Sequence, residues 1–149
     1  MSAGLPFLIQ NVLIAGCAIF AYRQGGRAER LGAVWFGVNM IVGVTLGLSG
    51  WASPVVQLVE DGIFALGLLP LTMIYVSYWM GLLTLIAAAL FSLEAAYLLN
   101  DRPVDNLYIW VNNLLWLAAP LVLLSCGITN WRHNRKAALA AQAPAPVEA

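Results

Sequence analysis

The sequence predicts an all-α fold: an integral membrane helical bundle with four transmembrane helices (five possible) plus a short interfacial helix. Two observations favour this class. The chain is 62% hydrophobic and only 9% charged, whereas a soluble domain is about 45–50% apolar and about 25% charged. Its apolar stretches also approach the roughly 20 residues that a helix needs to cross a bilayer. Because so few charges cannot cover a water-exposed surface, we expect lipid to solvate most of this chain.

The first two predicted spans flank a hydrophilic turn. One covers Leu5–Tyr22, and no positively charged region precedes it, so we expect it to be retained rather than cleaved as a secretory signal. The turn covers Arg23–Arg30, where the Gly25–Gly26 pair favours a chain reversal. The second predicted span covers Leu31–Gly50.

The middle of the chain can be divided in two ways. From Gly62 to Leu99, over 38 residues, the only charge is Glu94, and no polar turn separates two spans. A hairpin turn of apolar residues would bury backbone amides with little to satisfy them. We therefore expect a short interfacial or re-entrant helix over Ser53–Leu69 and one span over Leu71–Leu99. Division near Gly81 would give five spans.

The last predicted span follows a polar turn. The turn covers Asn100–Asn106, and the span covers Leu107–Cys126. Residues 1–131 are predicted to form a single transmembrane domain. Residues 132–149, basic and then rich in alanine and proline, lack the apolar side chains for a core and are predicted to be a disordered tail.

The distribution of basic residues tests the number of spans. Cytoplasmic loops carry an excess of lysine and arginine. Four spans would place four basic residues on one side and three on the other, with both termini on the same side, whereas five spans would give six against one. The charges favour five spans and the missing polar turn favours four. We expect four.

Polar side chains inside the predicted spans are the candidates for function. Glu94 is the main one, because a charge within the bilayer is costly. It lies six residues before Asn100, about 9 Å along a helix, so it could line a cavity, reach the interface or pair across the turn with an asparagine of the last span. The candidates for a polar pathway, or alternatively for interhelical hydrogen bonds, are Glu94, Asn39, Asn112, Asn113 and Asn11.

Small residues indicate close helix packing. Asn39, Gly43, Gly47 and Gly50 share one face of the second span, and Gly81 belongs to a similar stripe in the third. Such stripes allow membrane helices to approach within a bundle or between subunits. After the last span, Arg132, Arg135 and Lys136 form a basic patch suited to lipid headgroups.

The sequence offers no support for catalysis or for a cofactor. It contains a single histidine, His133, two separated cysteines, and none of the common catalytic or phosphate-binding motifs. Its formal net charge is zero, so no nucleic-acid-binding surface is indicated. We expect a protein that is not an enzyme and that has no cofactor, no bound metal and no nucleic-acid partner.

Two functions are compatible with these features. The first is a small non-catalytic membrane protein that forms a homo-oligomer or joins a larger membrane complex, which the small-residue stripes and the scarcity of polar groups within the spans favour. The alternative is a channel or carrier for a small polar solute or protons. Convergence of Glu94, Asn39, Asn112 and Asn113 on one cavity would favour transport, and dispersion would favour the subunit. We expect the subunit role, in a lipid bilayer that we take to be the bacterial inner membrane.

Overall fold

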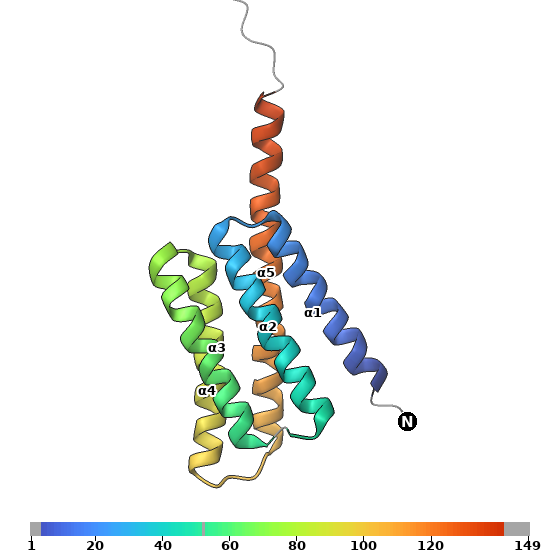
Figure 1. Ribbon diagram of the computed structural model, residues 1–149, viewed down its shortest axis with the longest axis vertical. Coiled ribbons are helices and arrows are strands. Elements are labelled where there is room, and N and C mark those ends of the chain that lie inside the picture. The colour runs from blue at the N-terminus through green and yellow to red at the C-terminus, as the bar shows by residue number, and fades with distance from the viewer. Residues whose placement is uncertain (1–3, 52, 142–149) are drawn as a thin grey trace, which may run out of the picture.

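The protein is a bundle of five antiparallel helices (Figure 1). The computed structural model describes the backbone of residues 4–51 and 53–141, and the side chains of residues 11–51 and 53–141. The predicted all-α class is confirmed, and no strand occurs within the described ranges. The helices are α1 (Gly4–Gln24), α2 (Arg27–Ser49), α3 (Pro54–Tyr75), α4 (Tyr78–Leu99) and α5 (Asn106–Ala141).

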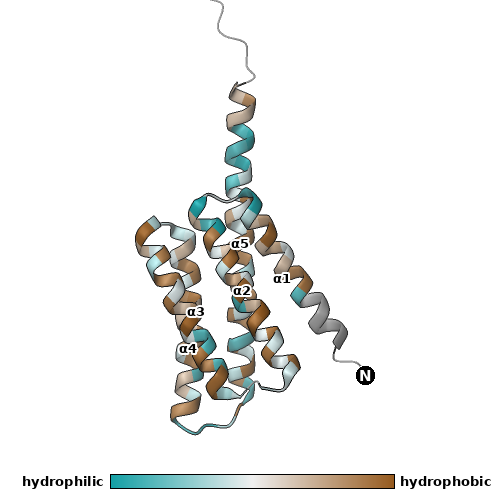
Figure 2. Ribbon diagram, viewed as in Figure 1, coloured by the Kyte–Doolittle hydropathy of each residue, from teal (hydrophilic) through white to brown (hydrophobic). Residues whose placement is uncertain are grey.

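The helices have the length and surface of membrane spans. The four helices α2 to α5 are each long and apolar enough to cross a bilayer, and α1 has 21 residues, a length that also suits a span. Hydrophobic residues predominate along the helices (Figure 2), and many large ones are exposed; Leu48 and Leu99, for example, are 79% and 84% exposed. So many exposed apolar side chains fit contact with lipid.

The prediction of a short interfacial helix before one long span is wrong. α3 does not end at Leu69 but continues through Pro70 to Tyr75, and α4 begins at Tyr78. α3 is therefore a full-length helix, and the division falls close to the position that the five-span alternative required.

The turn between α3 and α4 is short because its polar groups find partners without charged residues of its own. Val76 adopts a left-handed conformation (φ 47°) and donates its backbone N–H to the carbonyl of Thr72 at 2.9 Å. The Ser77 hydroxyl donates to Oε1 of Glu29, on α2, at 3.0 Å. The hairpin that the prediction excluded therefore forms, with the Val76 amide bonded within its own helix end and the Ser77 hydroxyl bonded to another helix.

The five helices place the start of α1 and the end of α5 at opposite ends of the bundle (Figure 1). One end, here called the basic end, holds the α1–α2 connection and the exposed part of α5; the opposite end holds the α2–α3 and α4–α5 connections. Arg102 is the basic residue described at the opposite end. The basic end carries the other six of the seven lysines and arginines: Arg23, Arg27, Arg30, Arg132, Arg135 and Lys136. This is the charge distribution of the five-span alternative.

The half of the bundle nearer the basic end is tightly packed. Phe36 is 1% exposed, and its ring centroid lies 6.0 Å from that of Phe64. Nε1 of Trp35 donates to the Phe64 carbonyl at 3.1 Å, and the Trp35 ring lies against Gly67, where a side chain would collide with it. The remaining large buried side chains here are Leu68, Met80, Leu83 and Leu123.

α5 extends beyond the rest of the bundle. Its 36 residues span about 54 Å, more than the thickness of a bilayer. Residues 132–141, predicted to belong to a disordered tail, continue the helix and are exposed (Figure 1), because alanine, arginine and lysine are strong helix formers. The rest of the predicted tail, residues 142–149, lies outside the described ranges.

Candidate functional site

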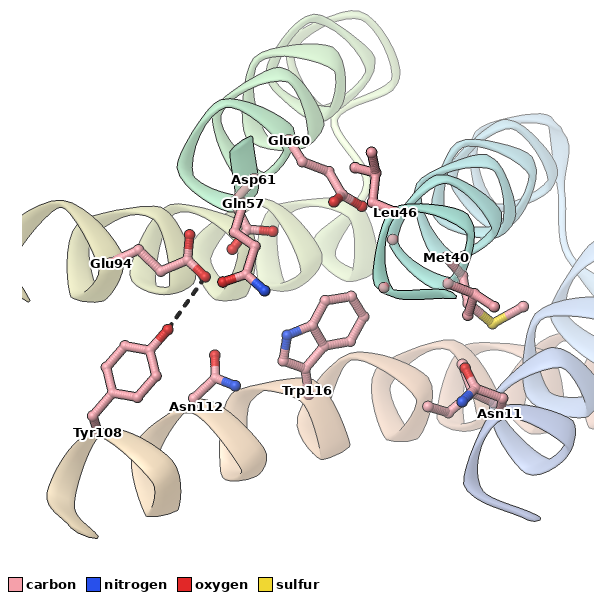
Figure 3. A pocket seen from close by; sticks show the side chains of 14 residues that line it. Asn11, Met40, Leu46, Gln57, Glu60, Asp61, Glu94, Tyr108, Asn112 and Trp116 are labelled. Carbon is pink, nitrogen blue, oxygen red and sulfur yellow. Dashed lines mark hydrogen bonds between the residues drawn. The ribbon is translucent and has the colours of Figure 1, made fainter. Parts of the chain in front are cut away.

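A cavity of about 400 Å³ lies between the five helices, toward the end opposite the basic end. We call it the acidic pocket (Figure 3). Asp61 lies seven residues after the start of α3 at Pro54, so the pocket is about 10 Å from that end of the helix. Its polar lining residues are Asn11, Gln57, Glu60, Asp61, Glu94, Tyr108 and Asn112. Ile14, Met40, Gly43, Val44, Leu46, Gly47 and Trp116 complete the lining.

Three carboxylates dominate the pocket. Asp61 is only 4% exposed and has no hydrogen-bond partner among the described residues. Glu60 and Glu94 are partly buried, and each has one buried carboxylate oxygen, Oε1 and Oε2 respectively, without a partner in the described part of the chain. No lysine, arginine or histidine lines the cavity. Buried carboxyl groups are paired with a cation or carry a proton, so these three can take up protons or a cation that enters the cavity.

Glu94 is connected to the α4–α5 loop through aromatic residues. The Tyr108 hydroxyl donates to Oε1 of Glu94 at 3.4 Å, and the Tyr97 hydroxyl donates to Oδ1 of Asp105 at 2.7 Å. The two tyrosine ring centroids are 4.9 Å apart. Asp105 also accepts the backbone N–H of Tyr108 at 2.9 Å. This backbone hydrogen bond, followed by that from Tyr97, holds the pKa of Asp105 below its ordinary value.

A second cavity, of about 250 Å³, lies between this loop and the acidic pocket. We call it the vestibule. It shares Gln57, Glu94 and Tyr108 with the pocket, so these three side chains separate the two spaces. Arg102 also lines the vestibule, but its guanidinium is paired with Asp105 at 2.7 Å. The vestibule therefore offers a route to Glu94 from the end opposite the basic end.

Aromatic packing closes the other side of the pocket. The Trp116 ring centroid lies 6.5 Å from that of Phe36, which in turn packs on Phe64. Both phenylalanines are buried. The packed half of the bundle therefore lies between the acidic pocket and the basic end.

The predicted polar residues are brought together only in part. Glu94, Asn112 and Asn11 line the acidic pocket, and Oδ1 of Asn112 is buried without a partner in the described chain. Asn39, 8% exposed, lines a neighbouring apolar groove between α2 and α3 that shares Glu60 with the pocket. Asn113 is exposed and does not line either space. Of the four residues chosen to distinguish the two functions, Glu94 and Asn112 converge on the acidic pocket, Asn39 lines the adjacent groove, and Asn113 lies outside both.

The predicted packing glycines have different surroundings. Gly43 allows Oε1 of Glu60 to approach to 2.8 Å of the position that a Cβ would occupy. Nothing described lies within 4 Å of such a position at Gly47 or Gly50, and at Gly81 the nearest atom, in Thr72, is at an ordinary 3.9 Å. Gly43 thus supports a contact inside the chain. A packing role for Gly47 and Gly50 against another molecule stays a prediction, as does a role of Arg132, Arg135 and Lys136, all exposed on α5, at lipid headgroups.

Five polar or aromatic lining residues were not among the predicted candidates: Gln57, Glu60, Asp61, Tyr108 and Trp116. The first three belong to α3, which was predicted to be an interfacial or re-entrant helix. The distribution of basic residues favoured a full span in this region, but the span was predicted to begin after Asp61, so it did not include these residues.

The described residues do not form a metal centre. No group of three or more histidine, cysteine, aspartate or glutamate side chains within them is arranged to hold a metal ion. Cys17 and Cys126 are free thiols. What the site offers is a set of hydrogen-bond acceptors with net negative charge, suited to a proton or to a cation that carries its own donors.

Comparisons with known proteins do not assign this chain to a family. No protein-family model, no curated protein and no solved structure matches this chain.

Proposed function

We propose that this protein is a membrane carrier for protons or a small, positively charged polar solute, and that the acidic pocket is its binding site. The observation that supports this best is the meeting of Glu60, Asp61 and Glu94 around one cavity without a basic residue in its lining. Acidic side chains that face a cavity inside a membrane bundle commonly belong to ion or proton pathways. The pocket therefore favours the transport alternative over the accessory-subunit role.

A carrier fits the packing better than a permanently open channel does. The vestibule leads from the pocket toward one end of the bundle, but the packed half around Phe36 and Phe64 separates it from the basic end. Passage through the protein therefore requires movement of the helices.

Two prolines inside helices could permit such movement. Pro70 lies within α3 and Pro120 lies within α5. Each removes the backbone hydrogen bond to the residue four positions earlier, Leu66 and Trp116 respectively. Because α3 carries Asp61 and α5 carries Trp116, bending at either proline would change the shape of the pocket.

The test is flux in proteoliposomes, with Asp61→Asn as the key variant. We expect the wild type to release an imposed proton gradient faster than empty liposomes do. Asp61→Asn should reduce this flux at least tenfold, because it removes the most deeply buried charge of the pocket while keeping its shape. Uptake of labelled butylammonium is measured on the same proteoliposomes. Flux of both protons and butylammonium equal to that of empty liposomes, or equal in wild type and variant, would contradict the proposal.

Asn134→Ala supplies the control. It shortens a polar side chain at an exposed position of α5 beyond the rest of the bundle, and this residue lines neither the acidic pocket nor the vestibule. Because alanine is a strong helix former, the variant should fold and transport like the wild type.

An oligomeric or accessory role remains a second candidate, and one observation favours it. The surroundings of Gly47 and Gly50 on α2 are open within one chain, as they would be if another helix packed there. The two roles are compatible, since many carriers are oligomers. We also propose, rather than conclude, that the membrane is a bacterial inner membrane.

A further inference from the structure

We propose that the ligand of the acidic pocket is a small organic ammonium ion with a short hydrocarbon part, and not a metal ion. This inference rests on the proposed function, because it concerns the same pocket. It is carried by the chemistry of the unpartnered atoms, by the size of the cavity, and by the division of its lining into a polar and an apolar part.

The unpartnered buried atoms at the pocket are all oxygens. They are Oε1 of Glu60, Oε2 of Glu94 and Oδ1 of Asn112. Asp61, more than nine-tenths buried, adds a carboxylate without a hydrogen-bond partner among the described residues, and Figure 3 shows it in the same space as Glu94 and Asn112. Leaving buried acceptors unsatisfied is costly, so the ligand that fits must supply several donors. An ammonium group supplies three together with the compensating positive charge.

The dimensions of the pocket argue against a bare metal ion. Its volume of about 400 Å³ falls within the range of roughly 300–1,000 Å³ typical of small-molecule sites. A calcium or magnesium ion needs several oxygen ligands close around one point, and no such group of acidic side chains exists in the described part of the chain. Acceptors spread around a larger space suit a molecule that reaches from one to another.

The remaining lining accounts for the hydrocarbon part. In Figure 3 Glu94 and Asn112 lie toward one end of the pocket, Trp116 lies in the middle with Glu60 above it, and Met40 lies toward the other end, beside the amide of Asn11. Ile14 adds an apolar, buried side chain. The indole ring attracts a cation to its face, and the apolar side chains provide a surface for a short alkyl chain.

The test measures binding of butylammonium to the full-length protein in lipid nanodiscs by calorimetry. We expect saturable binding, with butan-1-ol, KCl and MgCl₂ at least tenfold weaker. Asp61→Asn and Glu94→Gln should each weaken butylammonium binding at least tenfold, since each removes one carboxylate from the lining, and Asn134→Ala, outside both cavities, should leave it unchanged. The use of two pocket variants, each compared with wild type by its elution profile in detergent, separates loss of binding from misfolding.

The outcomes also distinguish this inference from the proposed function. Equal binding of butan-1-ol would show an apolar site, and tighter binding of K⁺ or Mg²⁺ would show an inorganic cation site; either overturns the ligand class. Proton flux that depends on Asp61, without butylammonium binding, would overturn this inference and leave the proposed function intact. Butylammonium binding without any flux would support the ligand class and overturn the carrier.

Discussion

At the scale of single residues, the pocket depends on where carboxylates meet the rest of the chain. Glu60 approaches α2 only because residue 43 is a glycine. Oε1 of Glu94 accepts a hydrogen bond from the Tyr108 hydroxyl, and Oε2 has no partner in the described chain. Asp61 has neither arrangement and is the most buried of the three. This difference is why Asp61 is the residue on which the functional tests concentrate.

Glycine positions provide a test of packing. We predict that Gly67→Ala destabilises the protein by about 1–3 kcal/mol, because the added methyl group would overlap the Trp35 ring, which is held by its hydrogen bond to Phe64. Gly47→Ala, with open space around it, should cost nothing measurable. The measurement is the free energy of unfolding in detergent. Equal stability of the two variants would contradict the packing described here, and a change of oligomer size in Gly47→Leu would reveal a partner at that face.

The sequence could predict some of these residues and not others. Glu94 stood out as the only charge in a long apolar stretch, and it does line the pocket. Glu60 and Asp61 carry the same chemical signal, but they lie near serines and a proline that resemble a surface segment. Asn113 was grouped with Asn112 by depth, yet adjacent helical residues point about 100° apart, and only Asn112 lines the pocket.

At the scale of elements, α5 combines a site and a hinge. It supplies Tyr108, Asn112 and Trp116 to the pocket, and its interruption at Pro120 comes one turn after Trp116. α5 also contacts α1, where the lack of a side chain at Gly127 lets Phe20 pack against the helix. One segment of α5 is thus fixed by packing while the segment nearer the loop carries the polar residues.

Replacing the proline inside α5 should slow transport. We predict that Pro120→Ala, by returning a hydrogen bond to the Trp116 carbonyl, lowers the flux severalfold while leaving ligand affinity within about twofold. Pro103→Ala, at an exposed position of the α4–α5 loop outside any helix and outside the lining of both cavities, should behave like the wild type. Flux and binding are measured on the same preparations. Unchanged flux in Pro120→Ala would mean that bending at this position plays no part in transport.

The helices were more predictable than the turn that separates two of them. The helices corresponding to α1, α2, α4 and α5 were predicted as spans, because length and composition mark a span strongly, whereas α3 was predicted as a short interfacial helix. The α3–α4 turn was missed because one of its hydrogen bonds joins residues distant in sequence. The Ser77 hydroxyl donates to Glu29, 48 residues earlier, and no local sequence pattern indicates this contact.

At the scale of the whole molecule, the orientation that we infer for the chain in the membrane rests on five helices and on the six-to-one distribution of basic residues between the two ends of the bundle. If the basic end is cytoplasmic, the vestibule and the acidic pocket open toward the other side of the membrane. The described state is then one in which the site faces outward and the packed half seals the cytoplasmic side.

Labelling of the two ends tests this topology. We predict that single cysteines at positions 2 and 142, in a Cys17→Ala, Cys126→Ala background, react with an impermeant thiol reagent from opposite sides of the membrane. Five crossings require this result, whereas the four-span prediction required the same side. Reaction of both positions from one side would contradict the arrangement of five spans.

The most direct measurement of the central claim is access to the pocket from each side. In the same cysteine-free background, Asn112→Cys places one thiol in the lining of the pocket. A fixed pocket reached through the vestibule would react with an impermeant reagent only from the side opposite the basic end. The carrier proposed here predicts reaction from both sides, with the rate from the cytoplasmic side lowered by Pro120→Ala. Reaction from one side alone, in wild-type and variant backgrounds and with or without butylammonium, would contradict it.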